Sequence, residues 1–331
     1  MAADRILFIT NPRPNFVEDI LHEGLDELLG PDRVICYPYK DYSSFQYNLQ
    51  PPSPQNELHR DRLGRAHLLE MREGIAGVVV GSIQPEAVSV WETLQVRFPR
   101  CPVAVVNGEL HDFAWPPGIR LTHRFQKDVL PEQFRAGIIP LPMAAPARAM
   151  LPFETERDID VSFVARSTHE LRRACADLLD RAGFTVLLDL PLPREQFCTV
   201  LNRSRIAVSV QGVAFDTFRY WEIPYHGALL LSQRLPTVIP DNFVDGESAV
   251  FFDTPPEMMV KIRELLADPE GLIRIAERGR ALAHERHTAV ARARYLLEKM
   301  GLPDLSDSGA GARSAAAAGG GGGLPSGATP T

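Results

Sequence analysis

Arg219, Glu222 and His226 lie in the stretch FRYWEIPYHGALLLSQ, residues 218–233, which ends in a run of apolar residues. Their spacing of three and four residues places the three side chains on one face of a helix. A carboxylate on that face can accept hydrogen bonds from two vicinal hydroxyls, as a ribose presents them. A surface helix whose arginine and glutamate face water fits the same residues, so both interpretations stay open.

A second candidate site follows the strand expected at 160–165, in the sequence VARSTHELRR. Arg166, Ser167 and Thr168 form a turn there, and we expect a helix to begin with Thr168 as its N-cap. The free N–H groups of a helix N-terminus and an adjacent arginine can together bind a phosphate. An ordinary capped helix with a surface arginine accounts for these residues equally well.

The glycine-rich signatures of common nucleotide sites are missing from the sequence. Asn11-Pro12-Arg13-Pro14 occupies the first strand-to-helix turn, where a dinucleotide-binding fold would carry G-x-G-x-x-G. There is no Walker A sequence either. The acidic pair in DID, residues 158–160, precedes its strand and is therefore badly placed to reach a metal-bound diphosphate. We expect no metal site.

The composition is that of a globular protein, with 45% hydrophobic and 23% charged residues among 331. A net charge of -7 argues against nucleic acid or an anionic membrane as the main partner. The four cysteines are far apart and give neither a zinc motif nor a disulfide framework. Because no segment is long and apolar enough for a membrane span or a signal peptide, we expect a cytoplasmic protein.

Short apolar runs alternate with helical patterns in both halves of the chain. In the N-terminal half they predict strands at 5–10, 33–38, 75–82 and 103–108. In the C-terminal half they predict strands at 160–165, 185–190, 205–210, 228–232 and 249–252. Helices are expected at 16–29, 86–97, 169–182, 194–202, 256–267, 269–285 and 288–300. Runs rich in Val and Ile indicate strands buried on both faces, hence parallel sheets in an α/β fold.

Two α/β domains follow from this pattern. The predicted division is an N-terminal domain over 1–143, a linker over 144–158, a C-terminal domain over 159–287, a final helix over 288–303 and a disordered tail over 304–331. Ligands of open parallel sheets bind outside the carboxyl ends of the strands, so we expect the site in the cleft between the domains. The candidate segments are 11–15, 82–84, 107–112, 166–169, 211–216 and the region of Glu222.

Several features of the C-terminal half occur together: the strand NRSRIAVSVQG, Arg-x-x-Glu before a small-residue turn and an apolar strand, the loop NFVDGES, and a final helix that begins HT. As a set they resemble the group 1 glycosyltransferases, in particular the branch that includes the CgeB-type spore-maturation proteins. Upstream, THRFQKDVLPEQFRAGIIPLPM is similar to the segment before the linker in that branch, with Gln126-Lys127-Asp128 departing from it. The resemblance covers residues 120–300, and residues 1–115 only by fold expectation.

The resemblance implies a GT-B architecture: two Rossmann-like domains facing a central cleft, a nucleotide-sugar donor on the C-terminal domain, the acceptor opposite, and a last helix that crosses back. By position, Glu222 would hold the donor ribose, Arg166 would face the diphosphate, and the loop at 246–247 would lie below the donor. No metal and no other cofactor is implied. The expected donor-binding residues are Arg166, Ser167, Thr168, Arg172, Arg219, Glu222, Gly246 and Glu247.

Departures from the family pattern concern catalysis. Many retaining members carry a second glutamate eight residues before the ribose-binding one, where this chain has Ala214. The lysine usually found after the phosphate-side arginine is also missing, and Arg172 and Arg173 are the nearest substitutes. His111 and Asp112 follow a strand end in NGELHDF and are the candidates for a catalytic base, with a loop free of chemistry as the alternative.

The sequence thus predicts a metal-independent, hexosyltransferase-like enzyme. It would move a sugar from a nucleoside diphosphate to an unknown acceptor, which could be a glycan, a lipid or a protein. The first alternative is a nucleotide- or sugar-binding protein of the same fold that has lost turnover, which Ala214 favours. The second is a two-domain binding protein of periplasmic type, against which the missing signal peptide argues.

Overall fold

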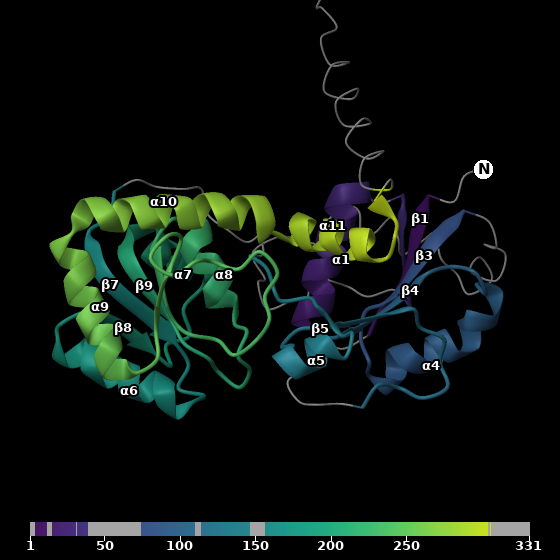
Figure 1. Cartoon of the computed structure of the whole chain (residues 1–331), viewed down its shortest axis with the longest axis horizontal. Coiled ribbons are helices and arrows are strands. Elements are labelled where there is room, and N and C mark those ends of the chain that lie inside the picture. Colours follow the sequence, from purple (N-terminus) through teal and green to yellow (C-terminus); the bar gives the residue numbers. More distant parts are fainter. Residues whose placement is uncertain are drawn as a thin grey trace, which may run out of the picture.

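The computed structural model describes residues 4–11, 15–30, 32–38, 74–109, 114–145, 156–303 and 305. Within these residues the chain forms two parallel β-sheets with helices packed on both faces of each (Figure 1). The predicted α/β fold with two parallel sheets is confirmed. No helix in the described residues has both the length and the apolar character needed to cross a bilayer.

The N-terminal half is built around strands that are apolar on both sides. Its elements are β1 (Arg5–Ile9), α1 (Phe16–Leu29), β2 (Val34–Tyr37), β3 (Ile75–Val80), α4 (Pro85–Leu94), η2 (Gln95–Arg97), β4 (Val103–Asn107), β5 (His123–Gln126), α5 (Pro131–Arg135) and β6 (Ile139–Pro140). The strand order is β2-β1-β3-β4-β5-β6. Ile6 and Phe8 pack on the side of α1, whereas Leu7 and Ile9 pack on the side of α4. This alternation buries both faces of the sheet.

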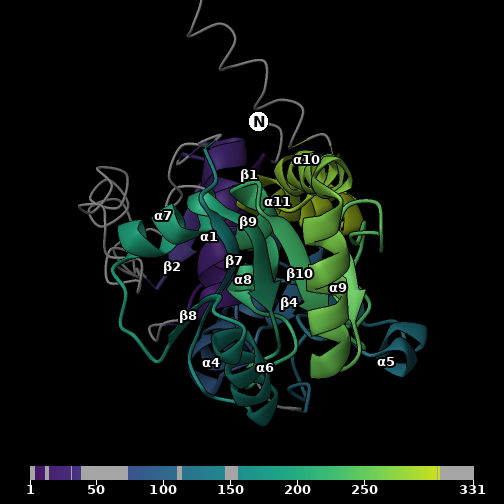
Figure 2. The same cartoon turned by 90° about the vertical axis from the view of Figure 1, so that its left-hand side faces the viewer.

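The C-terminal half repeats the pattern. Its elements are β7 (Ile159–Ala165), α6 (Glu170–Arg181), β8 (Thr185–Leu188), α7 (Arg194–Arg203), β9 (Ser204–Ser209), α8 (Phe218–Tyr225), β10 (Leu229–Gln233), β11 (Val250–Phe252), α9 (Pro255–Ala267) and α10 (Pro269–Arg286). The strand order is β11-β10-β9-β7-β8. Phe163 packs with Met258 of α9 on one face, and Leu230 packs with Leu201 of α7 on the other. Figure 2 shows α7 and α9 on opposite sides of this sheet.

The predicted strands are all present, but β5 and β6 were not predicted. In β5 only Phe125 and Gln126 are buried, and its first half, with His123 and Arg124, is polar and more exposed. A four-residue strand of this composition gives no apolar run to recognise.

Most of the predicted linker, at 146–155, and the predicted tail, apart from Leu305, lie outside the described residues.

The last helix, α11 (Ala289–Lys299), leaves the C-terminal half and packs against α1 of the N-terminal half (Figure 1). The expected return of this helix across the molecule is confirmed. Gly24 of α1 sits at the crossing, where a Cβ atom would lie 2.0 Å from the carbonyl oxygen of Ala289. Only glycine therefore permits the observed separation of the two helices.

A buried carboxylate joins the two halves. Asp216 accepts a hydrogen bond from the backbone N–H of Met143 at 2.6 Å and another from the Trp221 indole at 2.7 Å. Its own N–H donates to Asp128 Oδ1 at 2.9 Å. Burial, followed by the charge of Asp128, raises the pKa of Asp216 to about 6. Asp216 thus links the segment after β6 and helix α8 through its carboxylate, and the segment after β5 through its backbone N–H.

Gly24→Ala is expected to lower the free energy of unfolding by at least about 1–3 kcal/mol, because the added methyl group forces α1 and α11 apart. Urea denaturation measures the change. Glu27→Ala, one turn away on the same helix, is the matched control and should stay within about 0.5 kcal/mol of the parent. A Gly24→Ala protein as stable as the parent would contradict the close helix crossing.

Asp216 should make stability depend on pH in a defined direction. Its folded-state pKa of about 6 lies above the ordinary value, so the group stabilises the fold at low pH and loses that contribution as the pH rises through 6. Relative to Asp216→Asn, the parent should lose about 1–3 kcal/mol of unfolding free energy between pH 4 and 7. Urea titrations at several pH values measure this, and parallel curves for the two proteins would contradict it.

Candidate functional site

A cavity of about 240 Å³ opens at the carboxyl ends of β7 and β8, against α7 and α8. Its lining is Val164, Ala165, Arg166, Leu190, Pro191, Leu192, Arg194, Phe197, Phe218, Arg219 and Glu222. We refer to it as the Glu222 cavity. Three residues singled out in the sequence, Arg166, Arg219 and Glu222, therefore come together in one place. They come from two different segments, the end of β7 and helix α8.

Glu222 is buried and ion-paired. Its Oε1 accepts a hydrogen bond from Arg194 Nη1 at 2.6 Å, and the two side chains are only 2% and 9% exposed. The guanidinium of Arg194 also lies 5.0 Å from the centre of the Phe197 ring. The surface-helix interpretation of Glu222 is wrong, because the carboxylate does not face water. A buried charge needs such a partner, and Arg194 supplies it.

Helix α8 buries its charged residue because almost its whole surface is buried. Tyr220, Trp221 and Ile223 are each at most 1% exposed, so α8 is a core helix with Glu222 at the cavity. His226, expected on the same face, does not line the cavity. Its Nδ1 lies 2.9 Å from the Glu222 carbonyl oxygen, and burial lowers its pKa to about 4, which keeps it neutral.

The turn after β7 differs from the prediction. Helix α6 begins at Glu170 and its N-cap is His169, whose Nδ1 accepts from the N–H of Leu171 at 3.1 Å. The prediction of Thr168 as N-cap is wrong. Thr168 Oγ1 instead accepts a hydrogen bond from Arg172 Nη1 at 3.0 Å, which takes its hydroxyl away from the helix N-terminus.

Ser167 is engaged by the protein itself. Its N–H and its hydroxyl donate to the carboxylate of Asp189, at 2.7 and 2.5 Å. The hydroxyl bond and then the N–H bond lower the pKa of Asp189, and the charges of Arg173 and Arg166 add to the effect. The donors expected to receive a phosphate are thus occupied by a protein carboxylate.

Arg172 is buried and braces two loops. It donates to the carbonyl oxygens of Arg166 at 3.0 Å and Gln211 at 2.8 Å, and more weakly to that of Val210. Burial and then the charge of Arg219 lower its pKa to about 9. Arg172 does not line the Glu222 cavity, and its contacts hold the loops after β7 and β9 together.

A second cavity of about 360 Å³ lies between the two halves of the molecule. The N-terminal half contributes Asn107, Glu109, Gln126, Asp128, Leu130 and Gln133, and the C-terminal half contributes His169, Gln211, Gly212, Val213, Ala214 and Phe215. We refer to it as the interdomain cavity. Ala214, the position of the missing glutamate, is part of its wall. Amides and carboxylates dominate the opposite wall, a lining suited to hydroxyl groups.

Glu109 is, along the sequence, the described carboxylate nearest to the predicted base. His111 and Asp112 themselves lie outside the described residues. Glu109 Oε1 accepts from Asn15 Nδ2 at 3.1 Å and from the Ser82 hydroxyl at 3.4 Å, which orients it at the end of β4. Its segment was singled out because it follows a strand, but nothing in the sequence distinguished Glu109 from its neighbours.

Gly246 and Glu247 were predicted to bind the donor, but the structure places them away from both cavities. Gly246 and Glu247 are exposed in a turn where Gly246 N–H donates to the Ala249 carbonyl, and they line neither cavity. Arg194 was not predicted as a site residue, although it begins the helix after a strand.

In the described part of the chain, no group of three His, Cys, Asp or Glu side chains could hold a metal ion. Metal independence of the activity stays a prediction.

The C-terminal part of the chain resembles a known family. Residues 153–298 match the family model of glycosyl transferase-like proteins. This span carries Arg166, Arg194 and Glu222, so the whole Glu222 cavity falls within it. No curated protein sequence matches the chain.

Solved structures share the fold of nearly the whole chain. HepE of Anabaena in complex with UDP is 12% identical, with a TM-score of 0.56 over 90% of this chain and 99% of that one. A glycosyltransferase from Rickettsia africae ESF-5 is 8% identical, with a TM-score of 0.54 over 89% and 97%. Sucrose-phosphate synthase from Thermosynechococcus elongatus is 11% identical, with a TM-score of 0.52 over 95% and 100%. The chain has the GT-B fold that its sequence resemblance implied.

The buried Arg194–Glu222 pair should be costly to break. Arg194→Met leaves an unpaired buried carboxylate and is expected to lower the free energy of unfolding by about 3 kcal/mol. The double change Arg194→Met with Glu222→Leu should recover most of that loss. Arg203→Met is the control, because it breaks an exposed pair with Asp158 and should cost less than about 1 kcal/mol. Equal losses for the buried and exposed pairs in urea denaturation would contradict the assignment.

Proposed function

We propose that the chain is a glycosyltransferase that binds a nucleoside diphosphate sugar in the Glu222 cavity and transfers the sugar to an acceptor held in the interdomain cavity. The observation that carries this proposal is the lining of the Glu222 cavity, where a fixed carboxylate, three arginines and two phenylalanines meet at the carboxyl ends of parallel strands. Each group matches one part of a nucleotide.

The carboxylate of Glu222 would bind the ribose. Arg194 holds Oε1, and Oε2 takes no hydrogen bond within the described part of the chain, so it can accept one from a ribose hydroxyl. Phe197 and Phe218 offer aromatic faces against which a base can stack. The cavity volume of about 240 Å³ is smaller than a typical site for a whole ligand, so the sugar end of the donor would extend beyond it.

Arg166 and Arg219 would bind the diphosphate. Guanidinium groups form charge-assisted hydrogen bonds with phosphate oxygens, and two of them can stabilise the negative charge that develops on a departing diphosphate. This arrangement supplies the leaving-group stabilisation from side chains, which is the basis for proposing a metal-independent reaction. Ser167 adds little, because Asp189 already occupies its donors.

The sugar and the acceptor would meet in the interdomain cavity. Ala214 contributes no carboxylate there, so the acidic groups come from the opposite wall, as Glu109 and Asp128. Asp128 accepts from the Asp216 N–H, and its Oδ2 lies 3.5 Å from Lys127 Nζ, a positive charge that makes it a weaker base. Glu109 accepts from two neutral donors, the Asn15 amide and the Ser82 hydroxyl. We therefore assign Glu109 as the base that takes the proton of an acceptor hydroxyl.

Two comparisons support the donor class. The family model matches the segment that carries the Glu222 cavity. Among structures with the same fold, HepE of Anabaena was solved with UDP and with UDP-glucose. On this basis we propose a UDP-hexose as the donor, and a cytoplasmic, hexosyltransferase-like enzyme. The CgeB-type branch remains the proposed subgroup because its motifs cover residues 120–300.

A binding protein without turnover is the second candidate. With alanine at position 214, the C-terminal wall of the interdomain cavity has no carboxylate at the place where many family members carry a glutamate. Asp189 occupies the Ser167 N–H, a donor that could otherwise bind the diphosphate. Both features weaken the case for catalysis. This candidate predicts that nucleotide binding survives while no sugar is transferred.

UDP should bind without metal and through the proposed groups. In calorimetry with EDTA present, Glu222→Gln is expected to weaken UDP about tenfold, since a charged acceptor is worth about 1.5–3 kcal/mol. Arg166→Ala should weaken UDP about tenfold or more while leaving uridine unchanged, because its partner is phosphate. Arg181→Ala, an exposed arginine at the end of α6, is the control and should change neither affinity. Absence of UDP binding in the parent would reject both candidate functions.

Glu109→Gln separates the two candidates. If Glu109 is the base, release of UDP from UDP-glucose in the presence of acceptor sugars should fall at least about a hundredfold, the usual contribution of a general base. UDP affinity should stay unchanged, because Glu109 lies outside the Glu222 cavity. Equal turnover in parent and variant would remove Glu109 from the mechanism. No turnover in the parent, with UDP still bound, would favour the binding protein.

A further inference from the structure

Two phenylalanines touch across the boundary between the two halves of the molecule. Phe16 is the first residue of α1 in the N-terminal half, and Phe218 is the first residue of α8 in the C-terminal half. Their ring centres lie 5.1 Å apart, with an angle of 89° between the ring planes. In this geometry the positive edge of one ring meets the negative face of the other. The contact is therefore attractive and depends on the orientation of both rings.

Phe218 belongs to the Glu222 cavity, whereas Phe16 does not. The ring of Phe218 is part of the lining and is one of the two aromatic rings offered to a base in the proposed donor site. Phe16 is 38% exposed and lies outside that lining. A substitution of Phe16 thus removes no group from the wall of the cavity. Its effect on a bound nucleotide has to be relayed, and Phe218 is a cavity residue that Phe16 contacts.

The neighbour of Phe16 fixes the start of helix α1. Asn15 is the N-cap of this helix, and its Oδ1 accepts from the N–H of Glu18 at 3.2 Å. Its Nδ2 donates to Oε1 of Glu109, the proposed base, at 3.1 Å. Two adjacent residues therefore contact the proposed base and an aromatic ring of the donor cavity. The start of α1 connects the two candidate sites.

The orientation of the Phe218 ring matters for the affinity of a ligand that stacks on it. Phe218 is only half-buried, so the core does not enclose its ring completely. A side chain that a ligand must immobilise lowers the affinity, because the entropy of ordering it is lost at the moment of binding. The contact with Phe16 restricts this ring before a ligand arrives. The cavity is thereby organised in advance for stacking.

From this geometry we propose that Phe16 is a positioning residue of the donor site, which holds the Phe218 ring in the orientation on which the base of the nucleotide stacks. The inference rests on the proposed function, since it takes the Glu222 cavity as the nucleotide site. Phe16 itself does not touch the nucleotide. It brings the N-terminal half into nucleotide recognition through one aromatic contact.

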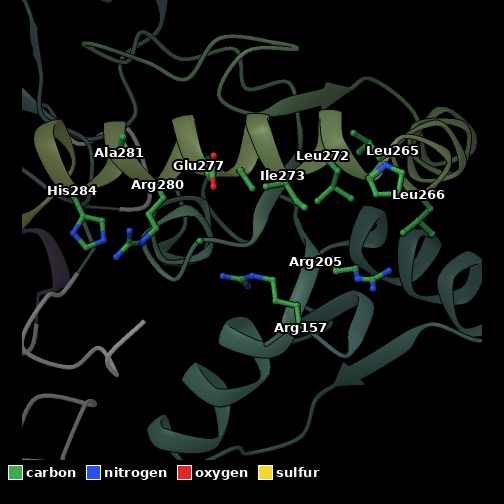
Figure 3. A pocket seen from close by; sticks show the side chains of 13 residues that line it. Arg157, Arg205, Leu265, Leu266, Leu272, Ile273, Glu277, Arg280, Ala281 and His284 are labelled. Carbon is green, nitrogen blue, oxygen red and sulfur yellow. The ribbon is translucent and has the colours of Figure 1, made fainter. Parts of the chain in front are cut away.

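A third cavity, of about 640 Å³, lies beneath helix α10 and is the alternative place for a nucleotide, because it is larger than the Glu222 cavity (Figure 3). We refer to it as the α10 cavity. Its wall includes Arg157 just before β7, Arg205 near the start of β9 and Gly227 just before β10. These positions are the amino ends of the strands, whereas ligands of open parallel sheets bind at the carboxyl ends. The topology therefore favours the Glu222 cavity.

Calorimetry with UDP on variants of the full chain tests the role of Phe16. Phe16→Leu should weaken UDP about threefold to tenfold, because one more side chain has to be ordered on binding. Phe16→Tyr keeps the aromatic edge and should bind UDP like the parent. Uridine should lose the same factor as UDP, since the ring faces the base and not the phosphates. Phe134→Leu, exposed on α5 and outside both cavity linings, is the control and should change neither affinity.

A double-mutant cycle separates positioning from a general structural effect. Phe218→Leu should weaken UDP by itself, and adding Phe16→Leu should have no further effect, because the ring that Phe16 holds is then missing. Losses that multiply in the double variant would show that Phe16 acts independently of Phe218 and would overturn the proposal. Equal losses in Phe16→Leu and Phe16→Tyr, or none in Phe16→Leu, would overturn it as well.

One further variant distinguishes a failure of this inference from a failure of the proposed function. Ile273→Asp changes an exposed apolar residue in the wall of the α10 cavity and should leave the affinity for UDP unchanged. A loss of affinity there would place the nucleotide beneath α10 and reject the proposed donor site together with the role of Phe16. If Glu222→Gln weakens UDP and Phe16→Leu does not, only the role of Phe16 is rejected.

Discussion

The buried carboxylate of Asp216 fixes the relation between the two halves of the molecule. It accepts from Met143 of the N-terminal half and from Trp221 of α8, next to Glu222. Arg292 of the crossing helix lies 4.8 Å from the Trp221 ring and donates to the Met143 carbonyl. Asp216 and Arg292 thus both bind the backbone of Met143, the carboxylate at its N–H and the guanidinium at its carbonyl oxygen. We refer to this arrangement as the clamp. Because Trp221 and Glu222 share one helix turn, the geometry of the Glu222 cavity depends on this clamp.

Buried arginines serve the architecture as much as the candidate site. Arg157, Arg172 and Arg292 each donate to two or more backbone carbonyls from different segments. Strand ends in a parallel sheet leave carbonyl groups without ladder partners, and a planar guanidinium can satisfy several of them at once. This role explains why an arginine shortly after a strand is ambiguous in a sequence. Arg166 lines the cavity, whereas Arg172, six residues later, braces the loops.

The sequence allowed the elements of the fold to be predicted because they depend on local periodicity. Strands rich in Val and Ile and helices of regular spacing were recognisable, whereas β5, with one aromatic and three polar residues, was not. Of the site, Arg166 was found by its place after a strand, and Arg219 and Glu222 were found by their spacing on one face of a helix. The partner of Glu222 could not be found, since Arg194 lies 28 residues earlier in the sequence. Contacts between segments that are distant in the sequence do not change the local residue pattern. For the same reason the roles of Asp189 and Glu109, which bind Ser167 and Asn15, could not be predicted.

The distribution of charges suggests how binding and turnover are divided in the proposed enzyme. Among the residues that the structure describes, those that line the Glu222 cavity all belong to the C-terminal half, so the proposed nucleotide site would draw on that half. Within the described lining of the interdomain cavity, the two carboxylates, Glu109 and Asp128, belong to the N-terminal half, and position 214 is alanine. In the proposed enzyme, the donor would be bound by side chains of the C-terminal half, whereas transfer would also require Glu109 of the N-terminal half to face the bound sugar. The hydrogen bonds of Asp216 and the packing of α11 on α1 join the two halves in the structure.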